Sequence, residues 1–134
     1  MNRNQTAGIV ACSNAVDRAY EYKIQELRDT LKSMGIDTVL SDLIYDTGYG
    51  FSAAGKERAE ELMTFYRDDK IDMIYDISGG DIANEILPYL DYEVISRTNK
   101  EFWGYSDLTA VINAIYAKTG RTSVLYQVRN LIGR

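Results

Sequence analysis

The sequence predicts one α/β domain built on an open parallel sheet. Short apolar segments alternate with stretches whose apolar residues recur every three or four positions, which is typical of strands separated by amphipathic helices. The chain has 134 residues, of which 46% are hydrophobic and 26% charged, enough for one buried core and too apolar for a disordered chain. Alternating strands and helices form parallel sheets, because each helix returns the chain to the same end of the sheet.

The first unit of this pattern covers residues 7–40. Ala7–Cys12 is a continuous apolar run, as expected for a strand that is covered on both faces. A helix is predicted from about Tyr20 to Met34, and Gly35 follows it as a C-terminal cap. Thr38–Leu40 is predicted to be the second strand. This strand–helix–strand order predicts that the two strands are parallel and are joined by a right-handed crossover.

A second helix is predicted from Ala54 to Arg67, after a loop from Ser41 to Gly55. The length of that loop is consistent either with a functional segment or with a simple mobile connection. The outer face of the helix, which includes Arg58, is predicted to be a solvated surface with ion pairs four residues apart. The residues expected on its inner face are Ala59, Leu62, Met63 and Tyr66.

The third strand, Ile71–Ile77, leads into Ser78-Gly79-Gly80-Asp81 and then a helical stretch, Ile82–Leu87, which Pro88 is expected to end. Two glycines between a strand and a helix permit positive φ angles and leave amides pointing outward. The loop is therefore either an anion-binding nest or a tight turn. Its spacing matches neither dinucleotide-binding nor P-loop patterns.

The last unit contains the segment around Ser106. Val94-Ile95 is a short strand or a packing anchor, and Phe102–Tyr105 is predicted to be the next strand. A helix follows, with Asp107 predicted as its N-cap. Its apolar face is expected to hold Leu108, Val111, Ile112, Ile115 and Tyr116; Gly120 is expected to cap it, and Val124–Tyr126 to form a last strand.

Ser106 would lie at the corner between that strand and helix, beside the positive end of the helix dipole. Parallel α/β hydrolases hold a nucleophile at such a corner, although the residue after Asp107 is leucine and G-x-S-x-G is not matched. A serine there is also a common turn or cap residue. The loops Ser13-Asn14, Ser78–Asp81 and Tyr105–Asp107 all follow strands, so they are expected to meet at one edge of the sheet, where ligands bind.

The composition excludes several kinds of chemistry. The chain has no histidine, so it cannot complete a serine–histidine–acid triad or a histidine zinc site by itself. Its one cysteine, Cys12, lies in an apolar run and is expected to be a buried, inert thiol in a reducing compartment. The net charge of −5 argues against a nucleic-acid partner. No apolar run is long enough for a membrane span or a signal peptide, so a cytoplasmic location is expected.

Two motifs resemble the LD-carboxypeptidase family of serine peptidases, including its microcin C immunity branch. They are the glycine-pair segment from Ile77 to Asp91 and the sequence Gly104-Tyr105-Ser106-Asp107-Leu108. The loop before Lys56-Glu57-Arg58-Ala59 also fits, and the resemblance extends from Ala7 to Gly120. It implies a three-layer parallel sheet with flanking helices, flavodoxin-like and similar to class I glutamine amidotransferases.

The resemblance implies that Ser106 is the nucleophile and that backbone amides of Asp107 and of Gly79 or Gly80 form the oxyanion hole. Ser13, Asn14 and Asp81 are further candidates for substrate binding. The substrate would be a murein L,D-peptide or a peptide–nucleotide of the microcin C type, and no metal or organic cofactor is implied. In the family a C-terminal domain supplies the glutamate and histidine, so residues 1–134 are expected to be a nucleophile-bearing N-terminal domain that is inactive alone.

Two departures bear on the substrate and the assembly. Cys12-Ser13-Asn14-Ala15 replaces a Ser-Pro-Ser type turn, and the glycine-pair segment is nearer to the immunity branch than to the murein-recycling branch. A surface normally covered by a second domain would be apolar, which makes a homodimer a candidate assembly. The alternative is a non-catalytic module on the same fold that binds a small ligand or an anion.

Overall fold

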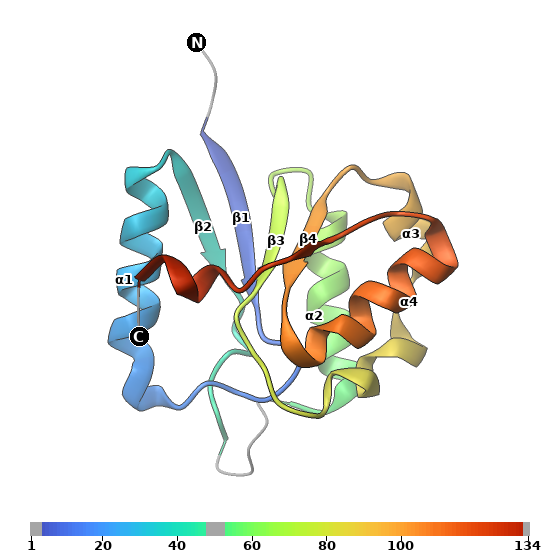
Figure 1. Ribbon diagram of the computed structural model, residues 1–134, viewed down its shortest axis with the longest axis horizontal. Coiled ribbons are helices and arrows are strands. Elements are labelled where there is room, and N and C mark those ends of the chain that lie inside the picture. Colours follow the sequence, from blue (N-terminus) through green and yellow to red (C-terminus); the bar gives the residue numbers. More distant parts are fainter. Residues whose placement is uncertain (1–3, 48–52, 133–134) are drawn as a thin grey trace.

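The computed structural model describes residues 4–47 and 53–132, and its centre is a five-stranded parallel sheet (Figure 1). The strand order is β2-β1-β3-β4-β5. The strands are β1 (Gln5–Val10), β2 (Ile36–Leu40), β3 (Met73–Asp76), β4 (Glu101–Gly104) and β5 (Val124–Leu125). This is the order of flavodoxin-like folds, whose direction of strand addition reverses between β1 and β3. The predicted α/β class and parallel sheet are confirmed.

Helices cover both faces of the sheet, as expected for parallel strands. One face carries α1 (Glu21–Ser33) and the C-terminal 3₁₀ helix η4 (Val128–Ile132), as Figure 1 shows. The other face carries α2 (Gly55–Arg67), the 3₁₀ helix η2 (Ala83–Tyr89), α3 (Tyr92–Arg97) and α4 (Thr109–Thr119). Two short 3₁₀ turns, η1 (Arg18–Tyr20) and η3 (Ser106–Leu108), precede α1 and α4. The result is the predicted three-layer arrangement.

Most of the predicted helix caps and buried helix faces are confirmed. Gly35 and Gly120 end α1 and α4 with φ angles of +84° and +74°, which glycine adopts without strain. The inner face predicted for α2 is buried in full. The prediction that Tyr116 lies on the apolar face of α4 is wrong, because Tyr116 is 60% exposed while Val111 and Ile115 are buried.

One other prediction was wrong about local structure, and one pair of alternatives is now decided. The helical stretch does not end before Pro88, because η2 includes this proline and continues to Tyr89. Of the two alternatives for Val94 and Ile95, the packing anchor is correct: both belong to α3, and Ile95 is buried. The side chain of Asp91 caps α3 by accepting a hydrogen bond from the Val94 amide at 3.2 Å.

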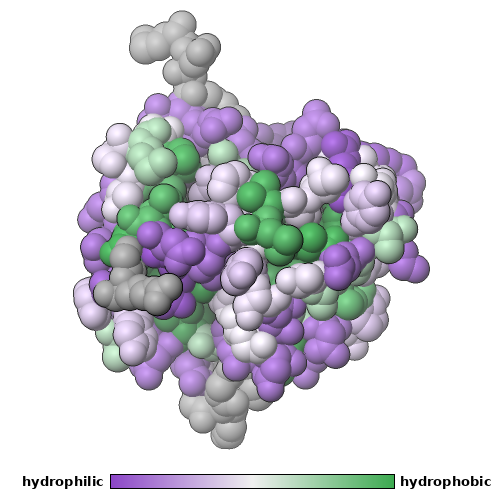
Figure 2. Space-filling model, viewed as in Figure 1, coloured by the Kyte–Doolittle hydropathy of each residue, from purple (hydrophilic) through white to green (hydrophobic). Residues whose placement is uncertain are grey.

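The face that carries α1 leaves part of the sheet uncovered. An apolar groove runs over β3, β4 and β5, where Tyr75 and Trp103 pack with ring centroids 5.2 Å apart. Hydrophobic side chains are visible on this side of the molecule in Figure 2. Met34 and Leu125, both of which line the groove, are each 57% exposed.

None of the helices in the described ranges is long and apolar enough to cross a membrane.

Candidate active site

Ser106 lies at the corner between β4 and the helical segment η3–α4, as predicted. It is exposed, and its φ angle of +59° makes it the one residue other than glycine with a positive φ among those described. A side chain with a Cβ rarely adopts that angle, because the Cβ approaches the neighbouring carbonyl oxygen. The corner therefore holds its serine in a strained conformation with the side chain toward solvent. This is the backbone geometry of a nucleophile elbow.

The geometry of the elbow does not by itself activate the Ser106 hydroxyl. Within the described residues, the Ser106 hydroxyl forms no hydrogen bond that could draw off its proton. The Asp107 amide belongs to the first turn of η3, where no carbonyl of the same helix can accept its hydrogen. The corner can thus supply a hydroxyl nucleophile and an amide donor, and no base is hydrogen-bonded to the hydroxyl among the described residues.

The prediction that Asp107 caps its own helix is wrong. Its carboxylate turns away from α4 and accepts hydrogen bonds from the Ser13 hydroxyl at 2.6 Å and from the Ala83 amide at 2.7 Å. Ser13 follows β1 and Ala83 opens η2, so one side chain joins the loops after β1, β3 and β4. The predicted meeting of these three loops at one edge is confirmed, and Asp107 is the residue that ties them together.

The glycine pair lies in the loop after β3. Gly80 has a φ of +123°, and a Cβ there would overlap the side-chain amide of Asn14. Asn14 donates its backbone amide to the Gly79 carbonyl at 3.0 Å. The amides of Gly79 and Gly80 donate to no group within the part of the chain that the structure describes. They are therefore available to an anion or to a developing oxyanion.

A buried carboxylate holds this loop in place. Asp76, at the end of β3, is fully buried and accepts hydrogen bonds from the amides of Cys12 and Ser78, each at 2.8 Å, and from the Ser78 hydroxyl at 2.6 Å. Burial raises the pKa of Asp76, and the hydrogen bonds from Ser78 and Cys12 partly oppose that rise. Asp76 was not among the site residues predicted from the sequence. The signal available was a charged residue inside an otherwise apolar strand.

The other predicted site residues differ in how deeply they are buried. Ser13 is fully buried, and its amide donates to the Ser78 hydroxyl at 3.0 Å, so it supports the loops. Asn14 is half-buried, while Asp81 is exposed and its amide lies 3.5 Å from the Asn14 side-chain oxygen. Asn14 and Asp81 are the two that could contact a ligand. Cys12 is buried as predicted, and burial raises the pKa of its thiol well above the ordinary value.

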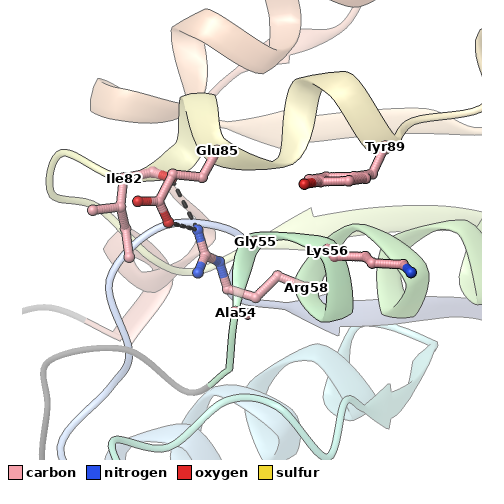
Figure 3. A pocket seen from close by; sticks show the side chains of 7 residues that line it. All are labelled: Ala54, Gly55, Lys56, Arg58, Ile82, Glu85 and Tyr89. Carbon is pink, nitrogen blue, oxygen red and sulfur yellow. Dashed lines mark hydrogen bonds and ion pairs between the residues drawn. The ribbon is translucent and has the colours of Figure 1, made fainter.

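The prediction that Arg58 lies on the solvated face of α2 is also wrong, because Arg58 is only 2% exposed. Its guanidinium donates to the carbonyls of Cys12, Ala53 and Ile82 at 2.7–3.1 Å, and to the Glu85 carboxylate at 2.9 Å. Figure 3 shows Arg58 and Glu85 facing each other across the pocket between α2 and η2. Helical periodicity could have found this arginine, because Leu62 and Phe65 follow it at +4 and +7 on the buried face of α2.

The strain at Ser106 can be measured. We expect Ser106→Gly to stabilise the chain by about 1 kcal/mol or slightly less, because glycine adopts the positive φ freely but loses more entropy on folding. Ser106→Ala keeps a Cβ and should leave the free energy of unfolding nearly unchanged. Urea denaturation of both variants measures the difference. If Ser106→Gly were less stable than Ser106→Ala by about 0.5–1 kcal/mol, which is the entropy cost of glycine alone, the corner would store no strain.

Comparisons with known proteins show the family to which the chain belongs. Residues 7–126 match the family described as LD-carboxypeptidase N-terminal domain. The chain belongs to that family. It is 40% identical over 90 residues to the microcin C7 self-immunity protein MccF of Escherichia coli, which is 67% of this chain and 26% of MccF. It is 27% identical over 120 residues to a protein of Bacillus subtilis named "probable murein peptide carboxypeptidase", which is 90% of this chain and 37% of that protein.

The fold of this LD-carboxypeptidase N-terminal domain has solved counterparts. A structure of MccF in complex with glutamyl sulfamoyl guanosine superposes with a TM-score of 0.82 at 32% identity, over 90% of this chain and 36% of that one. The chain spans about a third of the length of the curated relatives that it matches.

Proposed function

We propose that the chain is the nucleophile-bearing part of a serine peptidase that cleaves an amide bond next to an unusual residue. The observation that carries the proposal is Ser106, an exposed serine held at a φ of +59° where β4 ends, next to the loop that bears the glycine pair. Membership in the LD-carboxypeptidase N-terminal domain family supports a carboxypeptidase at the level of the family.

In the proposed reaction a base removes the proton of the Ser106 hydroxyl as its oxygen bonds to the scissile carbonyl carbon. The carbonyl oxygen becomes negative and accepts hydrogen bonds from the Asp107 amide and from Gly79 or Gly80. Collapse of this intermediate breaks the C–N bond, and the leaving amine takes the proton from the base. Water then hydrolyses the ester on Ser106 by the same two steps.

In this proposal the base comes from outside residues 1–134, since this sequence has no histidine. We propose that a second domain supplies a histidine and a glutamate, in line with the greater length of the relatives. The substrate is either a murein L,D-peptide or a peptide–nucleotide of the microcin C type. The names of the two relatives above support both, and a relative's structure holds a glutamyl nucleotide analogue. A homodimer is also proposed, to be tested by light scattering over a concentration series.

Turnover tests this proposal. We expect residues 1–134 alone to hydrolyse neither substrate, and a fusion to the C-terminal domain of a family member to hydrolyse one of them. In the fusion, Ser106→Ala should lower kcat by at least about 1,000-fold, because it removes the nucleophile. Product formation is followed by mass spectrometry. Activity of the isolated chain would contradict the proposal that the base comes from another domain. Undiminished turnover by the variant would contradict the assignment of Ser106.

The alternative is a module that binds an anion without cleaving it, and the unpaired amides of Gly79 and Gly80 favour it. Isothermal titration of the isolated chain with phosphate, nucleotides and muropeptides distinguishes the two. Tight binding of phosphate, together with an inactive fusion, would support the alternative.

A further inference from the structure

A second pocket lies at the carboxyl edge of the sheet, between the loops that follow β1 and β3. Its lining includes Asn14, Asp17, Gly79 and Arg129. The order of strand addition reverses between β1 and β3, and ligands of open parallel sheets bind at such a point. Gly79 belongs both to this pocket and to the proposed oxyanion loop, so a group bound here would lie next to the reacting carbonyl.

Arg129 reaches the pocket from the far end of the chain. The segment after β5 crosses the face of the sheet that carries α1, as Figure 1 shows. There Gln127 donates to the Ser78 carbonyl at 3.3 Å, and Arg129 donates to the Ile77 carbonyl at 3.4 Å. These two bonds attach the C-terminal segment to the residues just before the glycine pair.

The guanidinium of Arg129 has bonding capacity left over. It carries five N–H donors, and within the described residues its side chain makes only the one bond to Ile77. Asp17 lines the same pocket, and its carboxylate accepts a hydrogen bond from the Ala19 amide at 2.9 Å; among the described residues it forms no ion pair with Arg129. In a chain of net charge −5, the guanidinium of Arg129 is a cation whose remaining N–H groups can bind a carboxylate through two hydrogen bonds.

We propose that this pocket binds the free carboxylate of the peptide substrate and that Arg129 is the residue that recognises it. The inference rests on the proposed peptidase function, since a carboxypeptidase acts beside a terminal carboxylate. Arg129 pairs with the carboxylate through two N–H groups, while Gly79 and Asn14 form the adjoining wall. Asp17 lies on the same pocket and lowers the affinity by like-charge repulsion.

Binding by the 134-residue chain tests this without any turnover. The probes are N-acetyl-D-alanine and its neutral amide, titrated at low ionic strength and followed by NMR. We expect the acid to bind at least tenfold more tightly than the amide, with shifts at Asn14 and Gly79. Arg129→Gln should weaken binding of the acid about tenfold or more, Arg129→Lys by less, and Asp17→Asn should strengthen it.

Arg121→Gln is the matched control, because Arg121 contacts the Ser96 carbonyl on the opposite side of the sheet and should not affect binding. The proposal fails if acid and amide bind equally, if the wild-type chain binds neither, or if Arg129→Gln and Arg121→Gln behave alike. It also fails if inorganic phosphate binds at Arg129 more tightly than the acid. These outcomes are separate from the fate of Ser106, since a fusion could hydrolyse its substrate while this pocket bound nothing.

Discussion

Replacing Asp76 by alanine is expected to destabilise the chain by about 4 kcal/mol. The carboxylate is fully buried and accepts three hydrogen bonds, from the amides of Cys12 and Ser78 and from the Ser78 hydroxyl. Alanine leaves these donors buried without an acceptor and opens a cavity, and each orphaned donor costs about 1–3 kcal/mol. Urea denaturation monitored by circular dichroism measures the change in the free energy of unfolding.

Asp42→Ala is the matched control for Asp76, since Asp42 is exposed and should change the free energy of unfolding by less than about 0.5 kcal/mol. A second readout is the thiol of Cys12, which is 1% exposed and should resist thiol reagents in the native chain. Loss of Asp76 should speed its modification by loosening the contact between β1 and the loop after β3. A stable variant with an unreactive Cys12 would mean that Asp76 does not hold this loop.

Replacing Arg58 by methionine is expected to cost about 3 kcal/mol. Methionine fills much of the same volume but donates nothing to the carbonyls of Cys12, Ala53 and Ile82, which lose bonds to a charged donor. Its partner Glu85 is half exposed and can be hydrated, so the ion pair itself contributes little of the loss. Chemical denaturation measures the free energy of unfolding.

Two controls separate the buried hydrogen bonds from the charge. Arg67→Met removes an arginine of the same helix that is 53% exposed and pairs with Asp91 at the surface, and it should cost less than about 1 kcal/mol. Glu85→Gln removes the negative charge of the pair and keeps a side-chain oxygen to accept from Arg58, so its effect should also be small. If Arg58→Met and Arg67→Met were equally stable, the three carbonyl contacts would carry no energy.

The two buried charges show why the candidate site was predictable only in part. The two glycines and the serine stand in short motifs between a strand and a helix, so their places at the sheet edge followed from chain order alone. Asp76 and Arg58 each lie among apolar positions, in a strand and in a helix, but the local pattern does not show which groups they bind. The hydrogen-bond partners of Asp76 lie 2 and 64 residues away in the sequence, and the carbonyl partners of Arg58 lie 5 to 46 residues away.

The same distinction explains the error at Asp107. A carboxylate before a helix satisfies the rule for an N-cap, and the sequence contains nothing that favours a different acceptor role. The fold brings the Ser13 hydroxyl and the Ala83 amide within 2.7 Å of that carboxylate, from 94 and 24 residues away. A short, charge-assisted pair of hydrogen bonds in a partly buried site outweighs a cap at the solvent.

The sequence alone determined the α/β class, the parallel sheet, the glycine caps and the position of Ser106 at a strand-to-helix corner. Those features depend on local periodicity, on turn chemistry and on the order of elements along the chain. Only the tertiary structure decided the positive φ of Ser106, the burial of Arg58 and Asp76, and the approach of Arg129 to the glycine loop. These depend on contacts between residues far apart in sequence, which form only when the sheet assembles and desolvates the groups that it brings together.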